Sequence, residues 1–219
     1  MKQIALASIT LNAVNPMMEC LSAYAGIKAV NYLDSAILDI TRKEGHVTDA
    51  CMGRMASMLS RACMDGADGI ILTCTVFTPY LAAFHALFSV PIVSADAAMM
   101  EEAGTAGGKI AMICTFPGTL EPSMRLLRTC CKEHAKNTCT ITPYVLADAY
   151  EAAQHFDLAR HHHVILEKVK ELDALYDQIV LAQISMAPAV KGFIPAHAVL
   201  RTSPAAALKR LLKRIETTA

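Results

Sequence analysis

The chain has 219 residues, of which 54% are apolar and only 5% aromatic, and it contains no tryptophan. This composition predicts an aliphatic core, as in a buried parallel sheet with flanking helices. The 20 basic residues balance the 20 acidic ones, which excludes the charge excess of a nucleic-acid binder and favours a small-molecule partner.

Predicted strands and helices alternate along the chain. Short apolar runs bounded by turn residues predict strands at 4–9, 36–40, 69–73, 92–93, 109–114, 140–146, 178–182 and 198–200. Longer segments predict helices, among them 48–64, 120–135, 158–175 and 205–215. The alternation favours right-handed crossovers, and therefore an α/β fold with mainly parallel sheets.

The sequence also contains an internal repeat. Segment 68–79 aligns with segment 177–188 at an offset of 109 residues, and Pro16 falls over Pro122. Segment 2–6 resembles 109–112 with a slip of one residue, and 92–93 falls over 199–200. Four matches in the same order indicate two pseudo-symmetric α/β lobes with a cleft between them. We expect the first lobe to comprise residues 1–97 and 201–219, with the last helix packing on it, and the second to comprise 98–200.

Small polar clusters follow the predicted strands and precede helices. Asn15-Pro16, Thr78-Pro79 and Ser203-Pro204 each fit a capping residue followed by proline at the first helical position. In a parallel sheet these helix starts lie at the carboxyl edge of the strands, where ligands bind. Unpaired N–H groups at that edge favour an anion.

Cys74 has the sharpest chemical interpretation of the eight cysteines. It directly follows the apolar run 69–73 and precedes the helix that Thr78 is expected to cap, so the dipole of that helix would favour its thiolate. The alternative is a buried, inert thiol. The other seven fall within predicted helices or at the ends of predicted strands: Cys20, Cys51, Cys63, Cys114, Cys130, Cys131 and Cys139. Their scatter without paired spacing predicts reduced thiols and a cytoplasmic location.

Four segments together resemble the aspartate/glutamate/hydantoin racemase superfamily. They are Cys74-Thr75 after an apolar strand, Thr115-Phe-Pro-Gly-Thr119, the second-half strand that ends at Gln183, and Thr202-Ser203-Pro204. The resemblance covers nearly the whole chain. It implies an isomerase that uses neither pyridoxal phosphate nor a metal, a small carboxylate substrate, and a homodimer or higher homo-oligomer.

The resemblance also implies a mechanism from which this sequence departs. Two-base racemases of this group place one cysteine from each lobe on opposite sides of the substrate carbon, and Cys74 matches the first. Gln183 occupies the second position, and glutamine is neither a general acid nor a general base. Relatives with a single cysteine include maleate isomerases and arylmalonate decarboxylases, although the decarboxylase cysteine resembles the second-lobe position. A lyase therefore stays an alternative.

The resemblance thus assigns Cys74 as the nucleophile or proton carrier. Thr75, Thr115 and Thr119 are expected to donate hydrogen bonds to a carboxylate or to the enediolate formed from it. The further substrate-binding residues that we expect are Thr10, Asn12, Ser185 and Gln183, the last through its amide. A carboxylate-binding protein without turnover is the alternative outside enzymology.

Three other motifs have simpler explanations. Consecutive side chains at His161-His162-His163 diverge on a helix, so no metal is expected there. Segment 104–109 is rich in glycine but leads into a strand, whereas a phosphate loop leads out of one. The basic amphipathic segment 205–215 is expected to pack on a lobe, and no membrane partner is expected.

Overall fold

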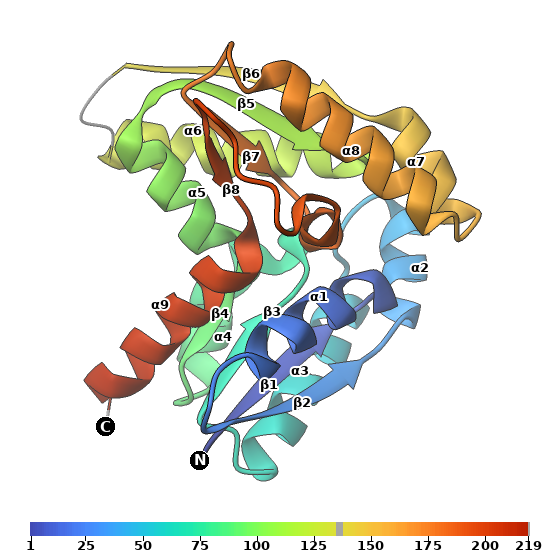
Figure 1. Cartoon of the computed structure of the whole chain (residues 1–219). Coiled ribbons are helices and arrows are strands. Elements are labelled where there is room, and N and C mark those ends of the chain that lie inside the picture. The colour runs from blue at the N-terminus through green and yellow to red at the C-terminus, as the bar shows by residue number, and fades with distance from the viewer. Residues whose placement is uncertain (135–137, 219) are drawn as a thin grey trace. The chain divides into compact units, whose positions relative to one another are not determined.

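The computed structural model describes residues 1–134 and 138–218 (Figure 1). The chain divides into two compact units. The first comprises Met1–Ala95 and the segment from Pro204 onward, and the second comprises Asp96–Ser203. Among the described residues, no helix is both long and apolar enough to cross a membrane.

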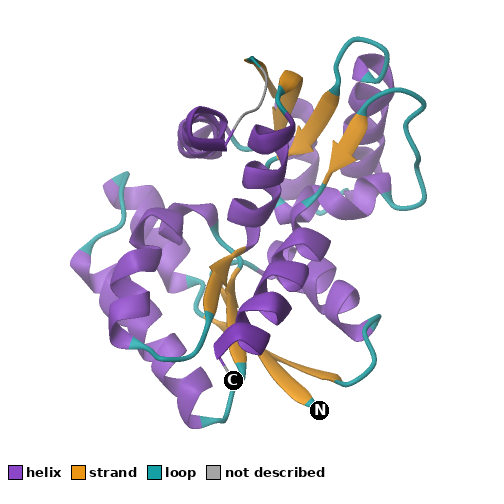
Figure 2. Ribbon diagram, turned by 90° about the vertical axis from the view of Figure 1, so that its left-hand side faces the viewer, coloured by secondary structure: helices purple, strands orange, loops and turns teal. Residues whose placement is uncertain are grey.

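The first unit contains a four-stranded parallel sheet in the order β2-β1-β3-β4. Helices lie between its strands in the chain, and Figure 2 shows the helices in purple and the strands in orange. Its elements are β1 (Lys2–Ser8), α1 (Leu11–Ser22), β2 (Ile27–Leu33), α2 (Ala36–Glu44), α3 (Asp49–Met64), β3 (Gly69–Leu72), the 3-10 helix η1 (Thr75–Tyr80), α4 (Leu81–Leu87), β4 (Ile92–Ser94) and α9 (Ser203–Thr218).

The second unit repeats this topology with the strand order β6-β5-β7-β8, again all parallel. Its elements are α5 (Ala95–Ala106), β5 (Gly108–Cys114), η2 (Pro117–Thr119), α6 (Leu120–His134), β6 (Cys139–Val145), α7 (Ala147–Gln154), α8 (Leu158–Leu172), β7 (Gln178–Leu181), η3 (Ile184–Val190) and β8 (Val199–Arg201). The predicted pair of parallel α/β sheets is confirmed. Residue 135, the predicted end of one helix, lies outside the described residues.

Hydrogen bonds at equivalent positions reproduce the internal repeat. Asp68 Oδ2 accepts the N–H of Gln3 at 2.6 Å, and Asp177 Oδ2 accepts the N–H of Lys109 at 2.7 Å. Each aspartate thereby ties the start of one strand to the start of its neighbour. The two bonds make Lys109 equivalent to Gln3, which agrees with the slip of one residue in the match of segment 2–6 with 109–112.

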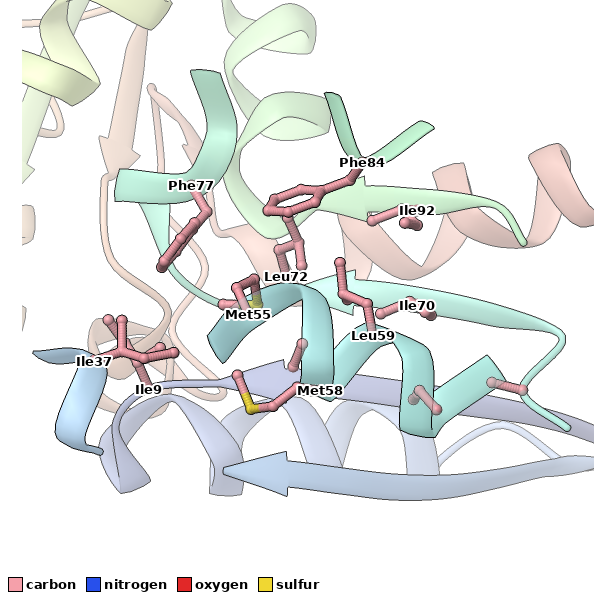
Figure 3. Packing of buried hydrophobic residues seen from close by; sticks show 14 of the residues in the cluster. Ile9, Ile37, Met55, Met58, Leu59, Ile70, Leu72, Phe77, Phe84 and Ile92 are labelled. Carbon is pink, nitrogen blue, oxygen red and sulfur yellow. The ribbon is translucent and has the colours of Figure 1, made fainter. Parts of the chain in front are cut away.

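One face of each sheet carries the larger hydrophobic cluster. In the first unit, Figure 3 shows Met55, Met58 and Leu59 of α3 packed over alternate residues of the strands, among them Ile70 and Leu72. Side chains alternate across a strand, so every second residue points to this face. In the second unit, α7 and α8 contribute the corresponding cluster through Ala149, Ile165, Val169 and Leu172.

On the other face of each sheet, helices pack very close to a strand or to another helix. A Cβ atom on Gly69 of β3 would lie 2.8 Å from Leu211 and 2.9 Å from Ile215, both on α9, so the last helix packs over the start of β3. In the second unit, a Cβ on Gly104 would lie 2.7 Å from the backbone carbon of Cys130. Glycine is therefore required where α5 crosses α6.

Two secondary-structure predictions were wrong in the first unit. Residues 36–40, predicted as a strand, begin α2, in which Thr41 Oγ1 donates to the carbonyl of Ile37 one turn earlier. Their apolar side chains serve equally well as one face of a helix, and Gly45, at φ 74°, ends it. The strand β2 was not predicted, because it lies at an edge and is only half-buried.

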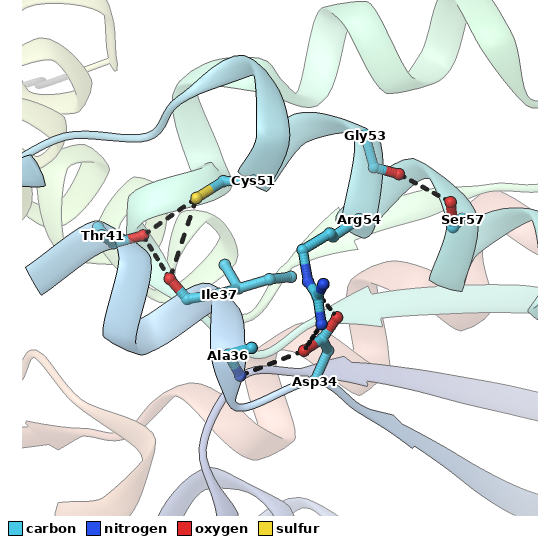
Figure 4. Close-up of polar contacts among 8 residues, drawn as sticks. All are labelled: Asp34, Ala36, Ile37, Thr41, Cys51, Gly53, Arg54 and Ser57. Carbon is cyan, nitrogen blue, oxygen red and sulfur yellow. Dashed lines mark hydrogen bonds and ion pairs between the residues drawn. The ribbon is translucent and has the colours of Figure 1, made fainter. Parts of the chain in front are cut away.

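Polar contacts join α3 to the chain between β2 and α2 (Figure 4). Arg54 donates to both carboxylate oxygens of Asp34, each at 2.8 Å. These bonds from the guanidinium hold the pKa of Asp34 below its usual value. Thr48 caps α3 by accepting the N–H of Cys51 at 3.3 Å.

Two glycines that lie within α-helices provide a matched pair for testing the helix crossing. Gly104→Ala should destabilise the protein by about 1–3 kcal/mol, because the added methyl meets backbone atoms that cannot move aside. Gly53→Ala on α3 should stabilise it by about 0.5–1 kcal/mol, because nothing lies within 4 Å and alanine favours the helix. Urea denaturation measures both, and equal effects would contradict the close approach of α5 to α6.

Arg54→Met tests the ion pair through pH. A carboxyl whose pKa is lowered in the folded state adds stability above its unfolded pKa of about 3.9, and loses it as the pH falls through the folded pKa. We therefore expect Arg54→Met to be less stable than the parent at pH 7, with the difference disappearing towards pH 2. Arg42→Met on α2 is the control, and a pH-independent difference would refute the assignment.

Candidate functional site

The carboxyl ends of the parallel strands form one edge of each sheet, and all the predicted site residues except Asn12 and Thr119 lie there. The first edge, in the first unit, consists of Ser8, Thr10, Thr73, Cys74 and Thr75, which follow or end β1 and β3. The second edge, in the second unit, consists of Cys114, Thr115, Gln183 and Ser185, which follow or end β5 and β7. Ligands of parallel α/β proteins bind at such edges.

Cys74 follows β3 closely in the chain, and it is half-buried at the first edge. It precedes η1 as the N-cap residue and packs against the core cluster of its unit. Thr75 follows it and is 8% exposed. The prediction that Thr78 caps a helix after Cys74 was wrong, because Thr78 lies within η1 and its hydroxyl lies 2.6 Å from Ser94 Oγ.

Thr10 begins α1 at the same edge. Its hydroxyl accepts the N–H of Asn12 at 3.3 Å, which leaves Asn12 on the exposed first turn. The predicted cap at Asn15 was wrong, because both Asn15 and Pro16 lie inside α1. The hydroxyl of Thr10 accepts an otherwise unpaired N–H of the first turn, so the helix begins before the proline. Proline has no N–H, and the helix therefore lacks one hydrogen bond to the carbonyl of Asn12.

Buried hydroxyl groups lie at the ends of the strands next to Cys74 in the sheet, and the sequence interpretation missed them. Thr73 Oγ1 donates to Ser8 Oγ at 3.1 Å, and Ser8 Oγ donates to Asn31 Oδ1 at 2.9 Å. Ser8 and Thr73 are 0% and 6% exposed. Hydroxyl residues directly at strand ends were the available signal. This network joins the ends of β1, β2 and β3, and so fixes the backbone that carries Cys74.

The second edge is organised around the side chain of Gln183. Its Oε1 accepts three hydrogen bonds: from the N–H of Thr115 at 2.7 Å, from Thr115 Oγ1 at 3.0 Å, and from the N–H of Phe116 at 3.3 Å. Thr115 was predicted to bind substrate directly. In the structure its two donors are directed at Gln183, 68 residues away in the sequence.

Two further predicted residues of the second unit are Thr119 and Ser185, and Cys114 lies near the first of them. Thr119 Oγ1 donates to the carbonyl of Phe116 at 2.7 Å. Ser185 is half-buried in η3. Cys114 ends β5, and burial raises the pKa of its thiol to about 11, against the opposing influence of the Thr119 hydroxyl.

Cys74 and Gln183 occupy equivalent backbone positions. Each is the N-cap residue of the 3-10 helix after a buried strand, with φ −123° and ψ 123° for Cys74 and φ −132° and ψ 137° for Gln183. The neighbouring strand accepts the preceding N–H in both units, from Thr73 to the carbonyl of Ala7 at 3.1 Å and from Ala182 to that of Ile113 at 2.9 Å. The duplication has thus kept the backbone while the side chain differs.

Within residues 1–134 and 138–218, no group of three His, Cys, Asp or Glu side chains is arranged to hold a metal ion. His161 is buried, and its Nδ1 lies 2.8 Å from the carbonyl of Ala149. The eight cysteines, all of which the structure describes, form no disulfide.

Comparison with known proteins places this architecture among the racemases. No family model and no curated protein matches the chain. An aspartate racemase from Picrophilus torridus is similar, at 13% identity and a TM-score of 0.74 over 99% of this chain and 95% of that one. A glutamate racemase from Bacillus anthracis is 12% identical, with a TM-score of 0.67 over 100% and 83% of the two chains. An allantoin racemase from Klebsiella pneumoniae is 16% identical, with a TM-score of 0.67 over 99% and 89%.

The protein is therefore of the two-unit parallel α/β class, with a duplicated four-stranded sheet. Within that class, its fold is that of the aspartate, glutamate and allantoin racemases. The resemblance inferred from the sequence motifs is confirmed at the level of the fold.

Thiol reactivity tests the burial of Cys114 at the second edge and of Cys131 on α6. With a pKa of about 11, Cys114 is only about 0.1% thiolate at pH 8, and Cys131, beside Cys139, has its pKa raised by burial to about 12. A brief treatment of the native protein with iodoacetamide at pH 8 should leave both unmodified. Mass spectrometry measures the labelling, with protein in urea as the control, and equal rates in the two conditions would contradict the burial.

Proposed function

We propose that the protein is a cofactor-independent isomerase that acts at a carbon of a small carboxylic or dicarboxylic acid, with Cys74 as its single catalytic thiol. Three similar structures are an aspartate, a glutamate and an allantoin racemase, whose names supply the class of reaction. The observation that carries the proposal is the position of Cys74, half-buried at the carboxyl edge of the first sheet, on a backbone fixed by buried hydroxyl groups.

The chemistry requires only the thiol and hydrogen-bond donors. The Cys74 thiolate removes a proton from the carbon beside the carboxylate, so an S–H bond forms as the C–H bond breaks. The electron pair moves into the carboxylate, which becomes an enediolate stabilised by donors. The same thiol then returns the proton. Return to the original face gives only exchange, so isomerisation requires the planar enediolate to turn its other face to the thiol before the proton is returned. An unsaturated diacid would follow an alternative route. The thiolate adds to the carbon–carbon double bond, rotation occurs about the carbon–carbon single bond that results, and elimination restores the double bond and the thiolate.

The other residues take the roles of binding and orientation. In the first unit, Thr75, Thr10 and the exposed Asn12 are the proposed contacts for polar groups of the substrate. In the second unit, these are Thr119, Ser185 and the amide nitrogen of Gln183. Thr115 acts through Gln183, because it holds the amide oxygen of that side chain with two hydrogen bonds.

Gln183 limits the reaction that the single thiol performs. An amide neither delivers nor accepts a proton in the working pH range, so proton removal and return both depend on Cys74. We therefore expect exchange of the substrate proton with solvent to be faster than inversion at the same carbon. Release of carbon dioxide would instead identify a lyase.

Replacement of Cys74 tests the proposal. With small amino acids and dicarboxylic acids in deuterated water, Cys74→Ala should reduce proton exchange or isomerisation, followed by NMR, by about 100-fold or more. Cys63→Ala, which removes a half-buried thiol from α3, is the matched control and should keep full activity. Full activity of a folded Cys74→Ala protein would sink the assignment.

A carboxylate-binding protein without turnover is the second candidate, and it is favoured because the position equivalent to Cys74 holds Gln183, which cannot act as an acid or a base. Alkylation separates the two functions. Rapid modification of Cys74 at pH 7, blocked by a dicarboxylate, supports the enzyme. Dicarboxylate binding by a protein whose Cys74 does not react supports the binding function.

A further inference from the structure

The three hydrogen bonds to Gln183 exceed what its amide oxygen normally accepts. An amide oxygen is uncharged and has two lone pairs, yet here it faces two backbone N–H groups and one hydroxyl, all within 3.3 Å. Carboxylate oxygens are charged, and charge-assisted hydrogen bonds are about twice as strong as neutral ones. The donor set is therefore better matched to a carboxylate than to the side chain that fills it.

The donors are held in place by contacts that do not involve Gln183. Thr115 is 3% exposed, and the turn after it is closed by the bonds from Thr119 N and Oγ1 to the carbonyl of Phe116, at 3.1 and 2.7 Å. The ring of Phe116 stacks on Tyr150, with the two ring centroids 5.2 Å apart. Because Gln183 takes no part in these contacts, removal of its side chain should leave all three donors oriented as they are.

The corresponding position in the first unit shows why the arrangement is specific to the second. Cys74 occupies the position equivalent to Gln183, and a thiol is a weak acceptor that is too short to imitate an amide. The donors of Thr115 and Phe116 are therefore occupied by the protein itself only because residue 183 is a glutamine.

We propose that Thr115 and Phe116 form a binding site for one oxygen of a small carboxylate, and that Gln183 keeps this site filled with its own amide oxygen. Gln183 is then an internal ligand, and free carboxylates bind there only when it is absent. This inference goes beyond the proposed function, since it concerns binding within the second unit and requires no reaction at Cys74.

Acetate is the probe, and Gln183→Ala is the variant that opens the site. In this variant, acetate should shift the amide resonances of Thr115 and Phe116 in a saturable way and raise the melting temperature. At ten times its dissociation constant the rise should be about 3–6 °C. Sodium chloride at equal ionic strength should do neither. The parent protein should show no saturable shift of these resonances at the same acetate concentrations.

The outcomes decide between the possibilities. The double variant Thr115→Val, Gln183→Ala keeps the cavity but loses the hydroxyl donor, and it should bind acetate at least about fivefold more weakly. Equal acetate effects on the parent and on Gln183→Ala would show that Gln183 blocks nothing. An absence of shifts at Thr115 and Phe116 in a folded Gln183→Ala protein would show that no carboxylate site exists.

Gln183→Glu gives an independent test that does not depend on the folding of the alanine variant. The introduced carboxylate would accept the same three bonds, so its pKa should fall below the usual value for a glutamate side chain, about 4.3. The stability of this variant relative to the parent should then be greatest at neutral pH and decline as the pH falls through that pKa. A pKa of the introduced carboxyl at or above about 4.3, measured by NMR titration, would overturn the proposal. Because neither readout uses turnover, failure here is distinguishable from inactivity of Cys74.

Discussion

Parallel pairing of β3 with β1, and of β7 with β5, is the constraint on which both candidate edges depend. The bonds from Thr73 to Ala7 and from Ala182 to Ile113 fix how far each chain extends beyond its neighbour before it turns. The next residue, Cys74 or Gln183, is therefore delivered to the carboxyl edge of its sheet. Asp68 and Asp177 fix the opposite ends of the same strand pairs.

The two units use this shared backbone for different chemistry. At the first edge, the position carries a thiol backed by buried hydroxyl groups that bond to one another. At the second edge, it carries an amide whose oxygen is fully engaged by the neighbouring strand end. The duplication preserved the geometry because that geometry resides in main-chain hydrogen bonds, which do not depend on the side chain at the varied position.

Predictions from the sequence succeeded where the hydrophobic pattern was unambiguous. The fully buried strands β3 and β7 and the long helices α3 and α8 were recognised from apolar runs and their lengths. The half-exposed edge strand β2 was missed. The start of α2 was assigned to a strand, because five residues of which four are apolar fit both structures. Thr10 was not recognised as a helix cap because proline at position 16 was a stronger local signal.

The sequence by itself determined the alternation of strands and helices, the duplication, and the presence of a cysteine and a glutamine at matching strand ends. These features are local, or they follow from comparing the chain with itself. Only the tertiary structure decided that Ser8 supports Thr73, and that Thr115 and Phe116 enclose the oxygen of Gln183. Such partners are 65 to 68 residues apart in the chain. They meet because the order of the strands in each sheet makes their ends neighbours, and that order arises from packing over the whole unit.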